Sequence, residues 1–227
     1  MINKLNIFFI KISKLISRKK LYSFIKEEIS KELLLTDNKL NILNVGSGGD
    51  VQKLLQQFKK VSLLNIDIDY LRKPDIVCDI TDINLSNIIN FEPDIVCIFE
   101  VLEHVKEPHK AVRNIYKILK KGGKCICSTP FIFPIHDEPN DYFRFTIYGL
   151  KLLFKDFSTI NILKKNGWLE SFFVNFTRLI KERNFILKII SVIFMFLYFL
   201  IYPLIIILQK ITSSDKLTSG YFLTAIK

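Results

Sequence analysis

From residue 41 onward, short apolar runs alternate along the chain with longer amphipathic stretches. Short apolar runs are typical of buried strands, and amphipathic stretches are typical of helices. The expected strands cover residues 41–45, 61–66, 75–78, 94–99 and 124–128, and the helices between them include 51–58 and 107–119. Because strands and helices alternate, the pattern predicts right-handed βαβ units and a mostly parallel α/β sheet with helices on both faces.

After residue 146 this alternation changes. A helix is expected at 147–154 and a strand at 158–163, then a long apolar segment and a last strand at 219–226. We therefore expect four parts, which are an N-terminal amphipathic helical segment (1–38), a core (39–170), an apolar helical insert (171–216) and a final strand of the core (217–227).

Several expected strands end in glycine or an acidic residue, at the edge of the sheet where ligands of parallel α/β folds bind. Gly46 and Gly48 follow the first strand, and glycine lets a backbone turn sharply against a ligand. Asp67 lies 21 positions after Gly46, where a carboxylate can accept both hydroxyl hydrogens of a ribose. Val51 stands where dinucleotide-binding loops have a third glycine. The pattern therefore favours an adenosine cofactor other than a nicotinamide dinucleotide.

Three segments, in this order, resemble the class I S-adenosylmethionine (SAM)-dependent methyltransferases. The run ILNVGSG at residues 42–48 resembles their glycine loop, FEVLEHV at 99–105 the segment after their fourth strand, and LKKGGK at 119–124 the turn into their fifth. The resemblance covers residues 40–160, approximately. It implies a Rossmann-like seven-stranded sheet of order 3-2-1-4-5-7-6, with SAM as the cofactor.

The resemblance also implies which residues bind SAM. The glycine loop would line the methionine, Asp67 would bind the ribose, and Glu100 would border the methionine end. The expected cofactor residues are Asn44, Gly46, Ser47, Gly48, Asp67, Ile68, Asp79, Ile80 and Glu100, with Asp79 and Ile80 beside the adenine. Two positions depart from the family pattern, since Asn44 replaces the usual acidic residue and Asp50 the usual third glycine. Asn44 can still support the loop by hydrogen bonding, but without a charge.

The segment 136–146 follows the fifth strand and is dense in polar and aromatic residues, a composition that suits a substrate lid. It resembles the Asp-Tyr-x-Arg-Phe-Thr segment of a subgroup of small methyltransferases, some encoded among cell-surface glycan genes. The candidate catalytic residues are His136 as the first choice of general base, His104 as the second, and Asp141, and the candidate substrate-binding residues are Asp137, Tyr142 and Arg144. Structural roles remain open for His104, beside the methionine, and for Arg144, in an ion pair with Asp141.

The leading interpretation needs no metal, but one alternative includes it. Glu100, Glu103 and His104, with His136 on the next loop, could hold a divalent ion that lowers the pKa of an acceptor hydroxyl. Some quinone and RNA-ribose O-methyltransferases resemble this arrangement, whereas metal-free relatives share the Leu-Glu-His triplet.

The apolar segment 189–208 contains no charged residue and is long enough, at about 30 Å as a helix, to cross a bilayer core. The last strand at 219–226 must nevertheless return to the sheet, and Pro203 is expected to break or bend a helix. Three interpretations stay open, which are a bent helical pair in one leaflet, a true membrane span, and a soluble dimer or lid helix. Basic residues flank the segment at Lys181, Arg183, Lys188 and Lys210.

The formal net charge of +11 favours an anionic partner, although codon bias toward lysine offers a second explanation. The N-terminus predicts a basic amphipathic helix for a membrane surface or for packing over the domain edge, with one face formed by Leu5, Phe8, Phe9, Ile12, Leu15 and Ile16, and with Lys4, Lys11, Lys14 and Arg18 elsewhere. Nucleic acid is not expected as a partner, because the basic residues form no aromatic-interleaved stripe. The four cysteines lie in apolar runs and are expected to be reduced and buried in a cytosolic protein, namely Cys78, Cys97, Cys125 and Cys127.

Together these patterns predict a SAM-dependent methyltransferase on the cytosolic face of a membrane, as a peripheral or monotopic protein. Its expected acceptor is a glycan, a lipid-linked sugar or another lipid-borne molecule, methylated at oxygen. One alternative is a soluble methyltransferase of small molecules that uses the apolar helix to form a homodimer. Another is a non-catalytic SAM-fold membrane adaptor.

Overall fold

The computed structural model describes every residue except Met1, Ser213 and Asp215. The described chain forms two compact units. The helical unit comprises residues 1–21, 131–136 and 164–220, and the sheet unit comprises residues 22–130, 137–163 and 221–227. The first helix, α1 (Ile2–Leu34), contributes to both units.

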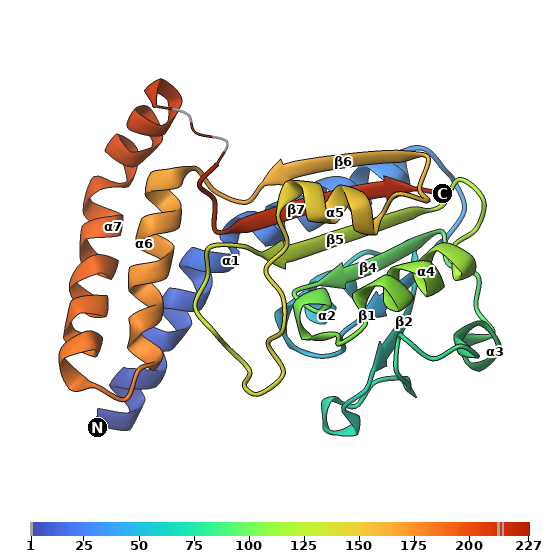
Figure 1. Cartoon of the computed structure of the whole chain (residues 1–227), viewed down its shortest axis with the longest axis horizontal. Helices are drawn as coiled ribbons and strands as arrows, with labels where there is room; N and C mark the ends of the chain where they lie inside the picture. Colours follow the sequence, from blue (N-terminus) through green and yellow to red (C-terminus); the bar gives the residue numbers. More distant parts are fainter. Residues whose placement is uncertain (1, 213, 215) are drawn as a thin grey trace. The chain divides into compact units, whose positions relative to one another are not determined.

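A seven-stranded sheet of order β3-β2-β1-β4-β5-β7-β6 is the framework of the sheet unit. β1 pairs in parallel with β2 and β4, and the outer pairs β2–β3 and β4–β5 are parallel as well. Figure 1 shows β7 running opposite to β5 and β6. The expected fold class and strand order are confirmed. The strands are β1 (Leu40–Val45), β2 (Val61–Asp67), β3 (Ile76–Val77), β4 (Ile95–Phe99), β5 (Lys124–Pro130), β6 (Thr159–Lys164) and β7 (Gly220–Ile226).

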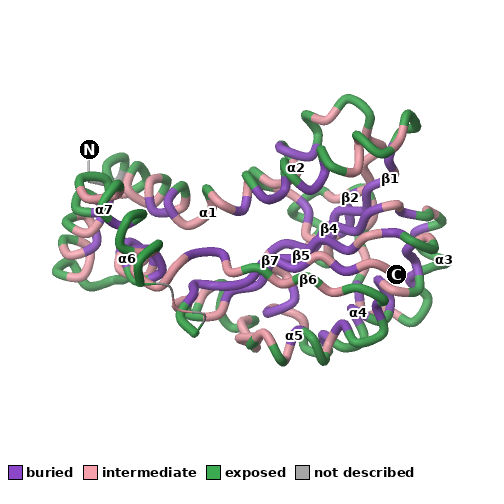
Figure 2. Tube along the Cα trace, turned by 90° about the horizontal axis from the view of Figure 1, so that it is seen from above, coloured by how far each residue is buried: buried purple, intermediate pink, exposed green. Residues whose placement is uncertain are grey.

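The core of the sheet unit follows the central strands, where Figure 2 shows buried residues in a continuous band. Ile42, Leu43 and Ile98 have no exposed surface, as expected of strands covered on both faces. The second part of α1 packs on the sheet, where Phe24 stacks on Phe222 with ring centroids 4.5 Å apart. The other helices are α2 (Gly49–Leu55), α3 (Leu85–Ile89), α4 (Pro108–Ile118) and α5 (Ile147–Leu153), with short 3-10 turns η1 (Tyr70–Arg72) and η2 (Leu102–His104).

The helical unit contains the first part of α1, α6 (Trp168–Arg178), η3 (Leu179–Lys181) and α7 (Phe185–Ile211). Its core is one cluster of buried residues, namely Ile16, Phe173, Val174, Ile180, Met195, Tyr198 and Ile205. Among the described residues, α7 is the helix that is long and apolar enough to cross a membrane, with a mean hydropathy of 2.7 over its most apolar window. The apolar helix expected before the last strand is therefore present.

Two expectations about local structure are wrong. α7 is one helix through Pro203 rather than a helix broken there, and Tyr198 and Ile205, on either side of the proline, are both buried in the core cluster. Cys78 is partly exposed rather than buried, since it follows the short edge strand β3. The expected helix at the N-terminus is present as α1, and within its expected apolar face Leu5, Phe8 and Leu15 are exposed whereas Ile16 is buried.

Candidate active site

The glycine loop connects β1 to α2 at the carboxyl edge of the sheet. Gly46 and Gly48 have φ values of +90° and +88°, which side chains other than glycine rarely adopt. A Cβ added to Gly46 would lie 2.6 Å from Val101 Cγ2, so the backbone at Gly46 also packs too closely on the segment after β4 to admit a side chain. The loop is therefore a narrow backbone cradle that only glycine can form.

A side chain that the sequence did not mark holds this cradle. Gln52 Oε1 accepts hydrogen bonds from the Ser47 hydroxyl at 3.1 Å and from the Gly48 backbone N–H at 2.6 Å. Ser47 is fully buried, so its side chain faces the protein rather than the cofactor edge. Gln52 lies at the end of the first turn of α2, so the helix that follows the glycine loop also holds the loop in place.

Behind the loop, two buried asparagines form a directed hydrogen-bond chain. Asn44 Nδ2 donates to Asn65 Oδ1 at 3.0 Å, and Asn65 Nδ2 donates to Asp75 Oδ2 at 2.9 Å. The Asn65 backbone N–H also donates to Asp75 Oδ2, at 2.7 Å. Asn44 thus has a defined amide orientation, although the acidic residue usual at its position is missing.

The end of β2 presents a carboxylate beside an exposed apolar side chain. Asp67 Oδ1 accepts a hydrogen bond from the Asp69 backbone N–H at 2.9 Å, and its Oδ2 lies 3.8 Å from Arg72 Nε. Ile68, the next residue, is 69% exposed. Large apolar side chains with this exposure at a strand end are suited to cover a flat ring.

The loop after β3 is held by α4. Asn114 Nδ2 donates to the backbone carbonyls of Ile80 and Asp82, both at 2.8 Å, and Asn114 is itself buried. Asp79 Oδ1 accepts from the Thr81 backbone N–H and hydroxyl, both at 2.8 Å, which turns the loop at its start. Asn114 is a second positioning residue that no sequence motif indicated.

Glu100 follows β4 with φ of +55°, a left-handed conformation that a residue with a Cβ adopts rarely and often at functional sites. Its backbone N–H donates to the Ser128 carbonyl at 2.9 Å, and Ser128 Oγ donates to Glu100 Oε1 at 2.7 Å. β5 therefore fixes both the backbone and the carboxylate of Glu100 at the same edge as the glycine loop.

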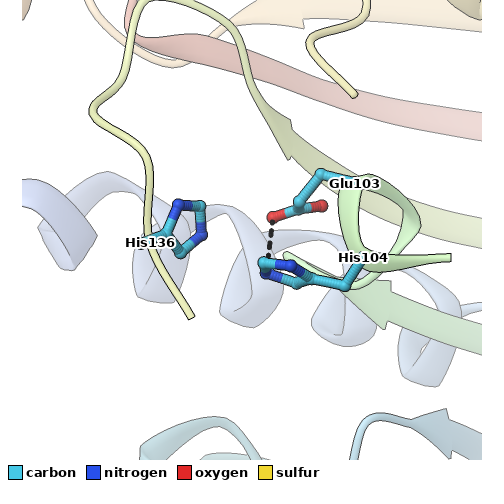
Figure 3. Close-up of side chains that lie close together, drawn as sticks. All are labelled: Glu103, His104 and His136. Atoms are coloured by element: carbon cyan, nitrogen blue, oxygen red, sulfur yellow. Dashed lines mark ion pairs between the residues drawn. The ribbon is translucent and has the colours of Figure 1, made fainter. Parts of the chain in front are cut away.

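Glu103 and His104 lie together in η2, as Figure 3 shows. His104 Nδ1 is 2.6 Å from the Asn140 carbonyl, which can only accept, so Nδ1 carries a proton. His104 Nε2 lies 3.8 Å from Glu103 Oε1 and 4.0 Å from Asp137 Oδ2. Two carboxylates around one imidazole nitrogen suit a ring that gains a proton, and such oxygen and nitrogen donors are also ligands of divalent ions.

The substrate-lid candidates divide into ion-paired and exposed residues. Arg144 donates to both oxygens of Asp141, at 2.6 Å each, and this hydrogen bonding raises the pKa of Arg144. The Asp141 side chain is 2% exposed, so the pair braces the segment. Tyr142 is 38% exposed, and its hydroxyl donates to Asn140 Oδ1 at 2.7 Å.

His136, the third residue labelled in Figure 3, belongs to the helical unit. Its Nδ1 lies 3.2 Å from the Pro134 carbonyl, and its ring meets the edge of Phe133 at 5.3 Å between centroids. The Arg178 guanidinium lies over the same Phe133 ring, 5.0 Å from its centroid.

Comparison of the chain with models of protein families identifies the family to which it belongs. A family model described as a methyltransferase domain matches residues 17–168. The chain belongs to this family of methyltransferases. A search of curated proteins gives no match.

Two solved structures with TM-scores above 0.5 have the same fold, and a third similar structure lies below that value. A SAM-dependent methyltransferase from Archaeoglobus fulgidus shares 13% identity with a TM-score of 0.55, over 94% of this chain and 98% of its own. The CurJ carbon methyltransferase shares 12% identity with a TM-score of 0.54, over 90% of this chain and 53% of its own. Phosphoethanolamine N-methyltransferase 2 from Haemonchus contortus, in complex with phosphomonomethylethanolamine and S-adenosylhomocysteine, shares 15% identity with a TM-score of 0.49, over 85% of this chain. The methyltransferase chain spans about half (49%) of that protein's length.

The family to which the chain belongs is SAM-dependent, so the cofactor is S-adenosylmethionine. The residues present fit an adenosine and methionine ligand, because Gly46 and Gly48 turn the loop at positive φ without a Cβ on the backbone, and Asp67 is a hydrogen-bond acceptor at the next strand end.

Proposed function

We propose that the methyltransferase transfers the methyl group of SAM to an oxygen of a glycan, a lipid-linked sugar or another lipid-borne acceptor on the cytosolic face of a membrane. The observation that carries the proposal is α7, a 27-residue apolar helix within the same chain as the SAM cradle, of which 22% of the most apolar window is buried. A helix that exposes so much apolar surface needs a partner, and a lipid bilayer would bring lipid-borne acceptors to the enzyme.

The proposed cofactor contacts follow the edge of the sheet. Gly46 and Gly48 admit the methionine, Asp67 accepts from the ribose hydroxyls, and Ile68 covers one face of the adenine. The positive φ of Glu100 and its bond to Ser128 support a role at the methionine end. In the proposed set, Asn44 and Ser47 support the loop from behind, and Asp79 and Ile80 form the adenine side.

His104 is the proposed general base. SAM supplies an activated methyl on its sulfonium, and an acceptor hydroxyl becomes a better nucleophile as it loses its proton. With Nδ1–H donated to the Asn140 carbonyl, the acceptor proton goes to Nε2. Glu103 and Asp137 stabilise the imidazolium that results. The acceptor oxygen forms its new bond to the methyl carbon as the carbon–sulfur bond breaks, leaving S-adenosylhomocysteine.

Asp141 is better suited to a structural role, because both of its oxygens accept from Arg144. Tyr142 and Asp137, both with exposed surface, are the proposed contacts to the acceptor. Arg144 would act by holding the segment that presents them. His136 stays a candidate base, to be compared directly with His104.

A labelled-methyl assay tests the proposal. The protein is incubated with methyl-labelled SAM and either a membrane lipid extract or a soluble metabolite extract, with Asp67→Asn as the matched variant that keeps the shape of the site. We expect label in the lipid extract, and a loss of at least tenfold with Asp67→Asn, since one ribose contact is removed. Label confined to the soluble extract would favour the soluble small-molecule methyltransferase.

The non-catalytic adaptor predicts a different result in a binding experiment. It is favoured by one observation, the replacement of the usual acidic residue by Asn44. Titration calorimetry with SAM separates the two, because an adaptor without a working cradle would release no heat even near millimolar cofactor.

A further inference from the structure

The uncharged polar residues of α7 form one stripe along its length. Ser191, Tyr198, Tyr202 and Gln209 are spaced by seven, four and seven positions, which places them on the same side of a helix. Ser191 and Tyr198 are buried, and Tyr202 and Gln209 are partly buried. The stripe therefore faces the interior of the helical unit.

Each member of the stripe meets a polar or charged partner inside the unit. Ser191 Oγ donates to the Thr177 carbonyl at 2.8 Å, and the Tyr198 hydroxyl donates to Glu170 Oε1 at 3.4 Å. Gln209 Oε1 accepts from the Glu170 backbone N–H at 3.2 Å. Lys19 Nζ lies 5.0 Å from the centre of the Tyr202 ring.

Polar contacts continue between α1 and α6. Glu170, with a side chain 4% exposed, forms an ion pair with Lys20. Ser13 Oγ donates to Thr177 Oγ1 at 3.4 Å, and both residues are fully buried. The interior of the unit thus holds a chain of satisfied polar groups beside its apolar core cluster.

The opposite side of α7 is apolar and exposed. Over roughly half of the helix circumference, the exposed residues from 185 to 208 carry no charge and no hydrogen-bonding side chain, and Lys188, at the edge of this side in the first turn of the helix, is partly buried. They are Phe185, Ile186, Ile189, Ile193, Phe196, Leu197, Phe199, Leu200, Pro203, Leu204, Ile206, Ile207 and Leu208. We call this set the outer face of α7.

This distribution is the reverse of a helix in a water-soluble protein, whose polar side chains face solvent. Polar residues turned inward and paired, with apolar residues turned outward, are typical of helices surrounded by lipid. A second copy of one helix would cover a narrower stripe than the outer face. Lipid acyl chains can cover all of it.

Basic side chains border the apolar surface. Lys181 and Arg183 before α7 and Lys210 near its end are exposed. On α1, Lys4 and Lys11 are exposed beside Leu5, Ile7, Phe8 and Leu15, which are 53–58% exposed. Lysine and arginine beside buried apolar surface complement the phosphates of an anionic leaflet.

We infer that the helical unit inserts into one leaflet of an anionic bilayer, with the outer face of α7 among the acyl chains and the bordering basic residues among the headgroups. β6 and β7 are strands of one sheet, so the chain leaves and returns on the same side of the membrane. If α7 crossed the bilayer, the segment between β6 and α7 would have to cross it as well. That segment is too short, because α6 and η3 run from residue 168 to 181, which is 14 residues and about 21 Å, whereas a bilayer core is about 30 Å thick. The inference deepens the proposed function, but its test needs no methyl transfer.

Flotation with vesicles tests the surface. The full chain is mixed with phosphatidylcholine vesicles with and without phosphatidylglycerol, and compared with the triple variant Ile193→Lys, Leu200→Lys, Leu204→Lys on the outer face. The matched control is Ile83→Lys, Tyr148→Lys, Leu152→Lys, which adds the same charge at three large exposed side chains of the sheet unit. We expect the parent and the control to float with anionic vesicles, and the outer-face variant to bind at least tenfold more weakly.

Fluorescence measures the lipid contact directly. The chain has one tryptophan, so the signal of an added tryptophan is obtained by subtracting the fluorescence of the parent protein from that of the variant. Phe196→Trp, at the middle of the outer face and 66% exposed, is expected to be quenched by lipids brominated on their acyl chains. Tyr148→Trp, at 80% exposure in the sheet unit, is expected to be unaffected.

Three outcomes would overturn the inference. Equal flotation of the parent and the outer-face variant, without quenching of Phe196→Trp, excludes insertion. A stable detergent-free dimer that the outer-face variant dissociates, without flotation of the parent, assigns the surface to a second copy. Protease access to the 181–184 turn only from the inside of sealed vesicles whose sheet unit is accessible from the outside would indicate a span. SAM calorimetry on each variant shows whether the sheet unit remains folded, so failure here is distinguishable from failure of the methyl-transfer proposal.

Discussion

Asn44 Nδ2 donates a hydrogen bond to Asn65 Oδ1 across 3.0 Å, between two neighbouring strands at the back of the glycine loop. The direction of this bond is set further along the chain, because Asn65 gives both its backbone N–H and its Nδ2 to the Asp75 carboxylate. With its Nδ2 turned to Asp75, Asn65 presents its Oδ1 to Asn44. A carboxylate at position 44 would meet an acceptor instead of a donor, so the departure from the family pattern at Asn44 is matched by Asn65 and Asp75.

The first prediction follows from that direction. Asn44→Asp is expected to lower the free energy of unfolding by about 1–3 kcal/mol, because either residue 44 or Asp75 then faces the oxygen of the Asn65 amide. Adding Asp75→Asn should recover part of the loss, since the Asn65 amide can turn over and accept from residue 75, although the Asn65 backbone N–H still requires an acceptor there. Chemical denaturation of the two single variants and the double variant measures the coupling.

Asp82→Asn is the control for a lost surface charge. The Asp82 carboxylate accepts a local hydrogen bond from the Asn84 backbone N–H and takes no part in the hydrogen bonds that link Asn44, Asn65 and Asp75. Combined with Asn44→Asp it should give only the sum of the two single effects. Strictly additive losses for the Asn44 and Asp75 pair would show that the direction of the hydrogen bonds has no influence.

The strands were predictable because they are short apolar runs, several of which end in glycine or an acidic residue, whereas their order was implied by the resemblance to class I methyltransferases. The same pattern located Gly46, Asp67 and Glu100 at one edge of the sheet. Gln52, Asn65 and Asn114 were not found, since each acts through a hydrogen bond to a distant backbone or amide group, and no spacing along the chain marks such a bond.

α6 was missed for a different reason. Its buried residues include Glu170, Ser171 and Thr177, so the periodicity of apolar residues that predicts a helix is interrupted on its inner side. α3 is only five residues long and too short for a periodic signal. The continuity of α7 through Pro203 depends on packing against the core cluster, which composition alone does not reveal.

A second prediction concerns the reactivity of Cys78. Partial burial, with smaller contributions from the negative charges of Asp79, Asp82 and Asp67, raises the pKa of Cys78 from 9.0 to about 11. The thiolate is the nucleophile, so at pH 8 alkylation by iodoacetamide should be about a hundredfold slower than for an ordinary thiol. The rate should rise about tenfold per pH unit from pH 7.5 to 9.5, because that range lies below the raised pKa. Mass spectrometry of the labelled protein follows each cysteine separately.

Asp79→Asn removes one of the charges and should make Cys78 react faster at pH 8, although by less than the full hundredfold, since burial is the larger cause. Saturating SAM should slow the labelling if Asp79 and Ile80 border the adenine. A rate at pH 8 equal to that of a free thiol would contradict the raised pKa.

A third prediction separates the two candidate bases. His104→Asn should lower kcat for an oxygen acceptor by about 10²–10⁴-fold while the Kd of SAM stays within a few-fold, because the base acts on the acceptor proton. The exposed His109→Asn on α4 is the matched control and should leave both constants unchanged. Steady-state kinetics with calorimetry gives both values.

His136→Asn is measured beside these variants. If it abolishes turnover while His104→Asn remains active, the base belongs to the helical unit and the assignment of His104 is wrong. Parallel assays after EDTA treatment test the metal alternative, which requires that chelation remove activity and that added divalent ion restore it.

The last prediction concerns the closest backbone contact of the glycine loop. Gly46→Ala faces two separate costs, the φ of +90° and a Cβ that would lie 2.6 Å from Val101 Cγ2. We expect the variant to lose SAM affinity by more than tenfold and to be less stable by about 1–3 kcal/mol, as is usual for a residue held at a rare backbone conformation. Adding Val101→Ala removes the atom that is struck but leaves φ unchanged, so it should recover only part of the loss. Full recovery would mean that the contact alone requires glycine at position 46, and no recovery would mean that the backbone conformation alone does.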